Sequence, residues 1–165
     1  MTALFVTRED IVKFTAMNGN VDTDKFIQFV KIAQDIHIQN YLGSKLFNKI
    51  NDAIVAGTLA NPYLALLKDY IKPMVIHFAM VEYLPFAAYT IANKGVYKHS
   101  SENATNVEKN EVDYLVEKEK NIAQHYTERF IDYMSFNQAL FPEYNNNSNG
   151  NMYPDTQNNY TGWFI

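Results

Sequence analysis

Apolar residues recur every three or four positions through most of the chain, which is the spacing of helices with one face turned toward a core. Thr7 stands three residues before Asp10 as an approximate capping box, and this pair predicts a short helix through Phe14. A longer helix is expected over residues 23–42, with Gly43 supplying a left-handed end. Its apolar stripe consists of Phe26, Phe29, Val30, Ala33, Ile36, His37 and Tyr41.

The middle of the chain predicts a shorter helix and then a long buried one. Residues 44–57 carry apolar positions at helical spacing and end on a glycine. Asn61-Pro62 is a start signal, an N-cap asparagine followed by proline at the first helical position. Residues 63–92 are apolar on more than one face, which is typical of a central helix. We expect one helix there, bent at Pro73 and Pro85 because each proline removes a backbone donor.

A long polar segment, residues 93–106, predicts an inter-helix loop that holds a short strand. Its length favours a functional or intersubunit role, for which the candidate residues are Lys94, Gly95, Val96 and Tyr97. Thr105 and Glu108 then form a capping box for the last long helix. The apolar stripe of that helix is Val112, Leu115, Val116, Ile122, Ala123, Tyr126, Phe130 and Tyr133. Glu119 falls within this stripe, so burial of the stripe requires a partner for its carboxylate.

The C-terminal segment changes in composition. Pro142 closes the helical body, and residues 144–160 contain seven asparagines and little that can form a core. The sequence thus predicts a helical domain over residues 1–143 and an extended tail over residues 144–165. Its apolar end either folds back onto the bundle or docks on another chain, with partner-binding candidates Tyr160, Trp163, Phe164 and Ile165.

These elements predict an all-α fold, a bundle of four to five helices with a long inter-helix loop. Its 165 residues suit a single domain with a proper core. Aromatic residues reach 15%, with 12 tyrosines, and tyrosine serves both half-buried cores and protein–protein contacts. The chain has no cysteine, which excludes disulfides and thiolate chemistry. No secretory signal and no stretch of membrane-spanning length is recognisable, so we expect a soluble protein.

Charge and motifs favour neither nucleic-acid binding nor catalysis. The net charge is −4 and no run of Lys and Arg is present. The four histidines form no metal-binding spacing, and His37 and His77 lie in apolar helical segments, where a hydrogen-bonded core histidine is the common outcome. No phosphate loop or nucleophile motif occurs. We therefore expect no enzymatic activity, no metal and no cofactor.

The N-terminal third nevertheless contains a recognisable series of motifs. The segment from Leu4 to Ile11 begins with a leucine, followed by a hydroxyl, an acidic and a hydrophobic position. A turn then carries Asp22 and Asp24, and the long helix contains the run from Phe29 to Ile36, including Gln34, and ends in Asn40-Tyr41-Leu42-Gly43. This series resembles the head–tail connector, or adaptor, proteins of tailed bacteriophages. The likeness extends to versions in crAss-like and other phages of Bacteroidetes. The further motifs Asn93-Lys94-Gly95-Val96 and Phe141-Pro142-Glu143-Tyr144 are similar to theirs.

The resemblance implies a structural virion protein at the head–tail junction, made in the host cytoplasm. Such subunits form a homo-oligomeric ring of about twelve copies below the portal protein, joined head-to-tail by heterologous contacts. The implied partners are the portal, a downstream tail protein, and double-stranded DNA that passes without sequence-specific binding. The resemblance also implies that the loop with Lys94, Gly95, Val96 and Tyr97 packs against neighbouring subunits or faces the channel. An acidic subunit suits such a channel, because DNA must slide without being gripped by its phosphates.

Two alternatives come from other classes of protein. A small helical DNA-binding or regulatory protein would need a basic second helix after the turn at Leu42-Gly43-Ser44, but that helix offers only Lys45 and Lys49. A helical-bundle enzyme would need an unrecognised metal site. Bound metal in the purified protein would favour the enzyme, and sequence-specific DNA binding would favour the regulator.

Overall fold

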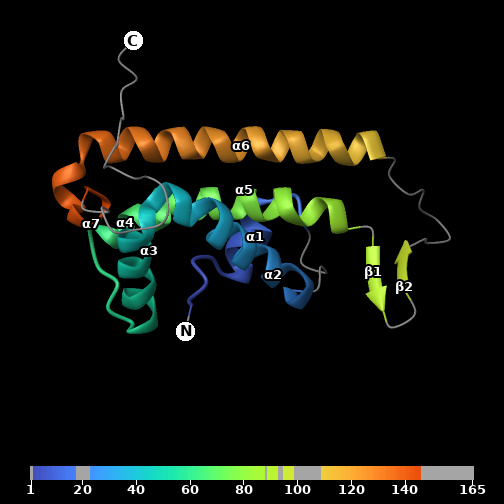
Figure 1. Cartoon of the computed structure of the whole chain (residues 1–165), viewed down its shortest axis with the longest axis horizontal. Coiled ribbons are helices and arrows are strands. Elements are labelled where there is room, and N and C mark those ends of the chain that lie inside the picture. The colour runs from blue at the N-terminus through green and yellow to red at the C-terminus, as the bar shows by residue number, and fades with distance from the viewer. Residues whose placement is uncertain (1, 18–22, 88, 93–94, 99–108, 146–165) are drawn as a thin grey trace, which may run out of the picture.

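The computed structural model describes residues 2–17, 23–87, 89–92, 95–98 and 109–145. It confirms the all-α bundle: helix α5 lies in the centre, α6 covers one side of it, and α1 and α2 pack on the other (Figure 1). Among the described residues, no helix is long and apolar enough to cross a membrane. Asp22 of the expected turn and the capping box of Thr105 and Glu108 lie outside the described residues.

The first helix, α1 (Arg8–Phe14), forms as its capping box predicts. The backbone N–H of Asp10 donates to the Thr7 hydroxyl at 3.3 Å, and the Thr7 N–H donates back to the Asp10 carboxylate at 2.9 Å. These two bonds satisfy donors that a helix start leaves unpaired. Ile11 then turns its side chain into the core and fixes α1 on the bundle.

The second predicted helix is present but changes its winding. Helix α2 (Thr23–Ala33) runs into a π-helical turn, η1 (Gln34–Ile38), and then into α3 (Gln39–Val55). The expected end at Gly43 is a sharp bend inside α3, where φ is 71° and ψ is 156°. Glycine adopts this backbone without the Cβ clash that other residues meet. Gly57, with φ at 66°, ends the helical run as predicted.

The helix predicted over residues 63–92 begins at Tyr63 as expected, but its N-cap residue differs from the prediction and it ends earlier, at Phe86. Pro62 occupies the N-cap position of α4 (Tyr63–Leu66), where the sequence placed Asn61. The helical run continues through a π-helical turn, η2 (Leu67–Ile71), and α5 (Lys72–Tyr83) to a 3₁₀ turn, η3 (Leu84–Phe86). The bend expected at Pro73 takes the form of η2, whose wider winding relieves the clash between a proline ring and the carbonyl four residues earlier.

Residues beyond this helix form a β-hairpin instead of continuing it. Strand β1 (Tyr89–Ala92) pairs antiparallel with β2 (Gly95–Lys98), and Thr90 lies opposite Tyr97. The strand expected near Val96 is therefore confirmed, whereas the helix predicted for its partner, residues 89–92, is wrong. The hairpin lies at the end of α5, beyond the helical bundle (Figure 1).

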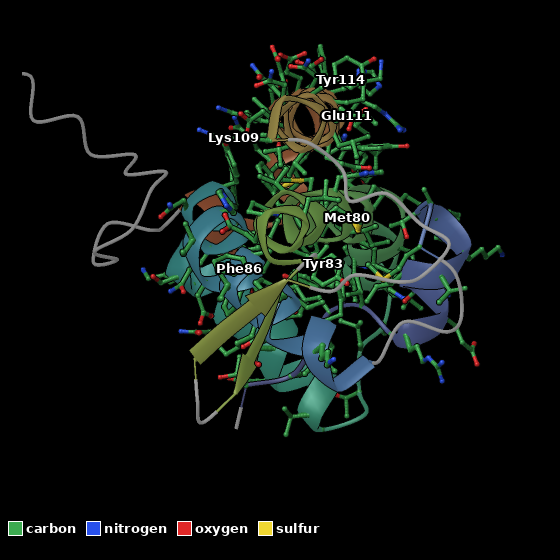
Figure 2. The ribbon with its side chains drawn as sticks, turned by 90° about the vertical axis from the view of Figure 1, so that its right-hand side faces the viewer. Met80, Tyr83, Phe86, Lys109, Glu111 and Tyr114 are labelled. Atoms are coloured by element: carbon green, nitrogen blue, oxygen red, sulfur yellow. The ribbon has the colours of Figure 1, made fainter. Side chains whose placement is uncertain are left out.

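Helix α6 (Lys109–Phe136) spans the length of the bundle and is followed by η4 (Gln138–Leu140) and α7 (Pro142–Asn145). Its buried residues are Ala123, Thr127, Phe130 and Met134, all in its C-terminal half. Tyr126 and Tyr133 of the predicted stripe pack against the core, but Leu115, at 44% exposure, does not. Figure 2, viewed along α6, shows Glu111 and Tyr114 beside and above this helix, away from α5 beneath it. The N-terminal half of α6 is thus packed on one side only.

Candidate functional site

The two histidines expected in the core join helices through carboxylates. His77 Nδ1 on α5 lies 2.7 Å from Glu119 Oε2 on α6, with both side chains largely buried. His37 Nε2 on η1 lies 2.8 Å from Glu82 Oε1 on α5, and the His37 ring stacks on Phe78 with centroids 4.3 Å apart. Both expectations, hydrogen-bonded histidines and a partner for Glu119, are confirmed. These pairs hold the central helix to its neighbours on both sides.

No metal centre emerges from these groups in the described part of the chain. Within it, no three side chains among His, Cys, Asp and Glu lie close enough to hold a metal ion. The two histidine–carboxylate pairs lie on different sides of α5, because one faces α6 and the other faces η1. The arrangement therefore supplies two separate links between helices.

A groove between α1, the start of α5 and α6 gathers many of the charged side chains. Its basic residues are Lys13, Lys68, Lys72 and Arg129, and its acidic residues are Glu9, Asp10 and Asp69. Phe14, Tyr70, Pro73, Ile76, His77 and Tyr126 supply its apolar and aromatic walls. The aromatic side chains and Arg129 are residue types enriched at protein–protein interfaces, whereas Lys, Asp and Glu are depleted there.

The Asp10–Lys72 ion pair fixes one wall of this groove. Lys72 Nζ lies 2.6 Å from Asp10 Oδ2, and the same carboxylate accepts the backbone and hydroxyl donors of Thr7. Partial burial alone raises the pKa of Asp10, but the hydrogen bonds from Lys72 and Thr7 outweigh it, so the pKa lies below its ordinary value. Asp10 thus stays ionised and holds α1 against α5.

Arg129 is the group in the groove best placed to bind an anion. Its guanidinium carbon lies 5.7 Å from the ring centroids of both Tyr70 and Tyr126. The Tyr70 ring in turn stacks on Tyr133 with centroids 4.2 Å apart, and Tyr126 stacks on His77 at 5.5 Å. No ion pair joins Arg129 to another described residue. The aromatic rings contact the guanidinium group of Arg129 and leave its N–H donors available. Arg129 is therefore suited to bind a carboxylate or phosphate of a partner.

A second polar link closes the C-terminal end of the bundle. The Tyr63 hydroxyl donates to Glu143 Oε2 at 2.6 Å, which joins α4 to α7. Phe141 is fully buried, and its ring meets Tyr63 edge-on at 5.5 Å. Burial raises the pKa of Tyr63 to about 12, and the hydrogen bond and negative charge of Glu143 add to this effect. The Phe141-Pro142-Glu143-Tyr144 motif therefore anchors the end of the helical body.

This link should make the protein sensitive to high pH. A tyrosine with a raised folded-state pKa stabilises the fold below the unfolded pKa near 10, and that contribution is lost as the pH rises toward about 12. Because Tyr63 is only partly buried and solvent screens its interactions, the wild-type protein should lose on the order of 1 kcal/mol of unfolding free energy between these values through this group. Urea unfolding of wild type and Tyr63→Phe at pH 8, 10 and 11.5 measures the difference. The two proteins should converge as the pH rises, and a constant difference would contradict this assignment.

None of the predicted site residues that the structure describes lines the groove. Tyr160, Trp163, Phe164 and Ile165 lie outside the described residues, and so does Lys94. Gly95, Val96 and Tyr97 form β2, of which the structure describes the backbone. The structure thus groups three of the loop candidates in one strand at the end of the bundle.

The placement of Arg129 beside the rings of Tyr70 and Tyr126 is absent from the sequence predictions, although the sequence contains one signal for it. Arg129 follows Tyr126 by three residues and precedes Tyr133 by four, so all three share one side of a helix. That spacing predicts contacts between the Arg129 guanidinium and the neighbouring tyrosine rings. The contribution of Tyr70 comes from another helix and leaves no comparable sign in the sequence.

Comparison with known families gives one match. A model described as Family of unknown function (DUF6712) matches residues 38–154, which covers α3 to α7. No curated protein and no solved structure matches the chain significantly. The matched range includes the groove residues of α5 and α6 but not those of α1.

Proposed function

The chain belongs to this family of unknown function, DUF6712, and from the resemblance of its N-terminal motifs we propose that it is a head–tail connector protein of a tailed bacteriophage. In this proposal, about twelve copies form a ring below the portal protein and join the head to the tail. Packaged DNA passes through the ring without sequence-specific contacts. The subunit acts by binding neighbours, and it carries out no reaction.

The observation that carries the proposal is the role of the motif residues in packing. The Phe5 N–H donates to Gln34 Oε1 at 2.7 Å, and Gln34 Nε2 donates to the Ala3 carbonyl at 3.0 Å. The hydroxyl and acidic positions of the same opening are Thr7 and Asp10, the capping box of α1. The motifs that resemble connector proteins are therefore residues on which this arrangement of helices depends. A resemblance in such residues supports a shared fold more strongly than one in exposed positions.

The groove around Arg129 supports a role in assembly. A ring requires a heterologous contact, in which one surface of a subunit meets a different surface of the next. Arg129 presents its donors beside aromatic walls, and this combination is typical of energetically important positions in interfaces. The net charge of −4 provides acidic side chains for such a contact and disfavours a grip on DNA phosphates.

Electron microscopy of the protein mixed with the portal of the same phage tests the proposal. We expect rings of about twelve copies bound coaxially to the portal. Arg129→Ala should reduce the ring population, whereas Lys120→Ala, at an exposed position of the same helix, should leave it unchanged. Failure of the wild-type protein to bind the portal at micromolar concentrations, or sequence-specific binding of duplex DNA, would refute the proposal.

A further inference from the structure

The outward face of α6 carries a pattern that is complementary to itself. The exposed residues Tyr114, Lys118, His125, Asp132 and Phe136 are spaced symmetrically about His125, at intervals of four, seven, seven and four. At about 100° per residue they fall within an arc of about 40°, and that arc lies roughly opposite the buried residues Ala123, Thr127, Phe130 and Met134. They form one stripe, here named the α6 stripe.

The two halves of the α6 stripe are opposite in charge. Lys118 and Asp132 lie at equal distances on either side of His125, and neither forms an ion pair with another described residue. A two-fold axis through His125 lays a second α6 antiparallel on the first, so Lys118 of each copy faces Asp132 of the other. A two-fold symmetric dimer uses the same surface on both copies. Such a contact requires reciprocal pairing, in which residue i of one copy contacts residue j of the other, and residue j of the first contacts residue i of the second.

The ends of the α6 stripe are complementary in shape as well. Phe136 is 89% exposed and Tyr114 is 65% exposed, which leaves large aromatic surfaces in water. The same two-fold axis places Phe136 opposite Tyr114. A shallow depression lined by Asn110, Glu111, Tyr114 and Leu115 lies there and can receive the Phe136 ring of the other copy. Figure 2 shows Tyr114 above α6, on the side away from α5, where a second helix can approach.

We propose that the α6 stripe is a dimerisation surface, on which a second copy of this chain packs its own α6 antiparallel. The paired length, from Tyr114 to Phe136, is about 33 Å at 1.5 Å per residue. A two-fold contact closes after two copies, so it cannot be the repeating contact of a ring. It describes the subunit before it enters an assembly, and it stands whether or not the protein is a connector.

Charge reversal tests the predicted pairing directly. Sedimentation equilibrium of the wild-type chain should show a monomer–dimer exchange. Lys118→Asp alone or Asp132→Lys alone places like charges opposite each other twice per dimer, and each should raise the dissociation constant roughly tenfold at low salt. The double variant restores opposite charges and should return the dissociation constant to within about threefold of wild type. A double variant that dimerises no better than the single variants would overturn the inference.

The lack of cysteine in the chain permits a second, independent test. His125→Cys puts one thiol of each copy at the proposed axis, so mild oxidation should link most of the protein into covalent dimers. Lys120→Cys, exposed on another side of the same helix, is the matched control and should link slowly. Equal rates for the two variants, or a protein that stays monomeric or forms only rings without linking at position 125, would overturn the two-fold contact. Those results leave the connector proposal intact, because it depends on a head-to-tail contact.

Discussion

Replacing Gln34 with alanine should lower the free energy of unfolding by about 3 kcal/mol, although Gln34 belongs to no catalytic or binding group. Its side chain is fully buried within the π-helical turn η1. There it accepts the Phe5 N–H and donates to the Ala3 carbonyl, so it holds the N-terminal segment against the bundle. Alanine leaves these two backbone groups without partners and opens a cavity beside Phe5. Both losses act on the folded state.

Urea denaturation with a matched control measures this effect. Gln28→Ala makes the same chemical change at an exposed position of α2, where the side chain only reaches the nearby Lys25 carbonyl. The control should change the unfolding free energy by less than about 0.5 kcal/mol. The denaturant slope should stay constant in both variants, since the surface exposed on unfolding hardly changes. Equal stability of the two variants would show that the N-terminal segment does not depend on Gln34.

Periodicity was a sound guide where a helix has one apolar face. The capping box at Thr7, the long helix before Gly43 and the end at Gly57 all depend on local chemistry, and all are confirmed. Glu119 is instructive, because a carboxylate inside an apolar stripe already required a partner. The partner proved to be His77, from a helix more than forty residues earlier in the chain. Sequence spacing within one helix cannot identify such a residue.

The sequence predictions are wrong where the local pattern of residues favours one structure and contacts with distant parts of the chain favour another. Residues 89–92 follow an apolar helix and continue its hydrophobic character, so their sequence predicts helix. A short apolar run fits a strand equally well, and in the structure these residues form a strand because they pair with Gly95–Lys98. Gln34 gave no signal either, because a glutamine in an amphipathic helix is usually exposed. Its burial follows from the N-terminal segment, which arrives from outside the helix.

The α6 stripe is an example of a solvent-exposed helix face whose residues also form a self-complementary pattern. Alternating charges along residues 109–120 are most simply interpreted as a face in water. The structure shows which of these residues point away from the bundle, and only then does the symmetry about His125 become visible. Residues on the other sides of α6 break the pattern, so the sequence alone does not display it.

The largest functional effect is expected from the apolar end of the tail, within the connector proposal. Replacing Trp163, Phe164 and Ile165 together with alanine should abolish stable attachment of the subunit to the portal. Burial of three such side chains contributes on the order of 5 kcal/mol before ordering costs. Repetition around a ring of about twelve copies turns even a small net gain per copy into strong avidity. Phage that carry the triple variant should accumulate filled heads without tails.

The thermal unfolding of the free subunit distinguishes this docking role from a packing role. If the three residues dock on another chain, the triple variant should unfold within about 2 °C of the wild type, because its own core is intact. A matched control with Asn146, Asn147 and Asn149 changed to serine should attach and unfold like the wild type, since it exchanges small polar side chains for small polar side chains and removes no apolar surface. A triple variant that unfolds at a much lower temperature would place the three side chains in the core of their own bundle. Normal joining of heads to tails would also refute the prediction, and the hairpin strand Gly95–Lys98 would then become the stronger candidate for the contact.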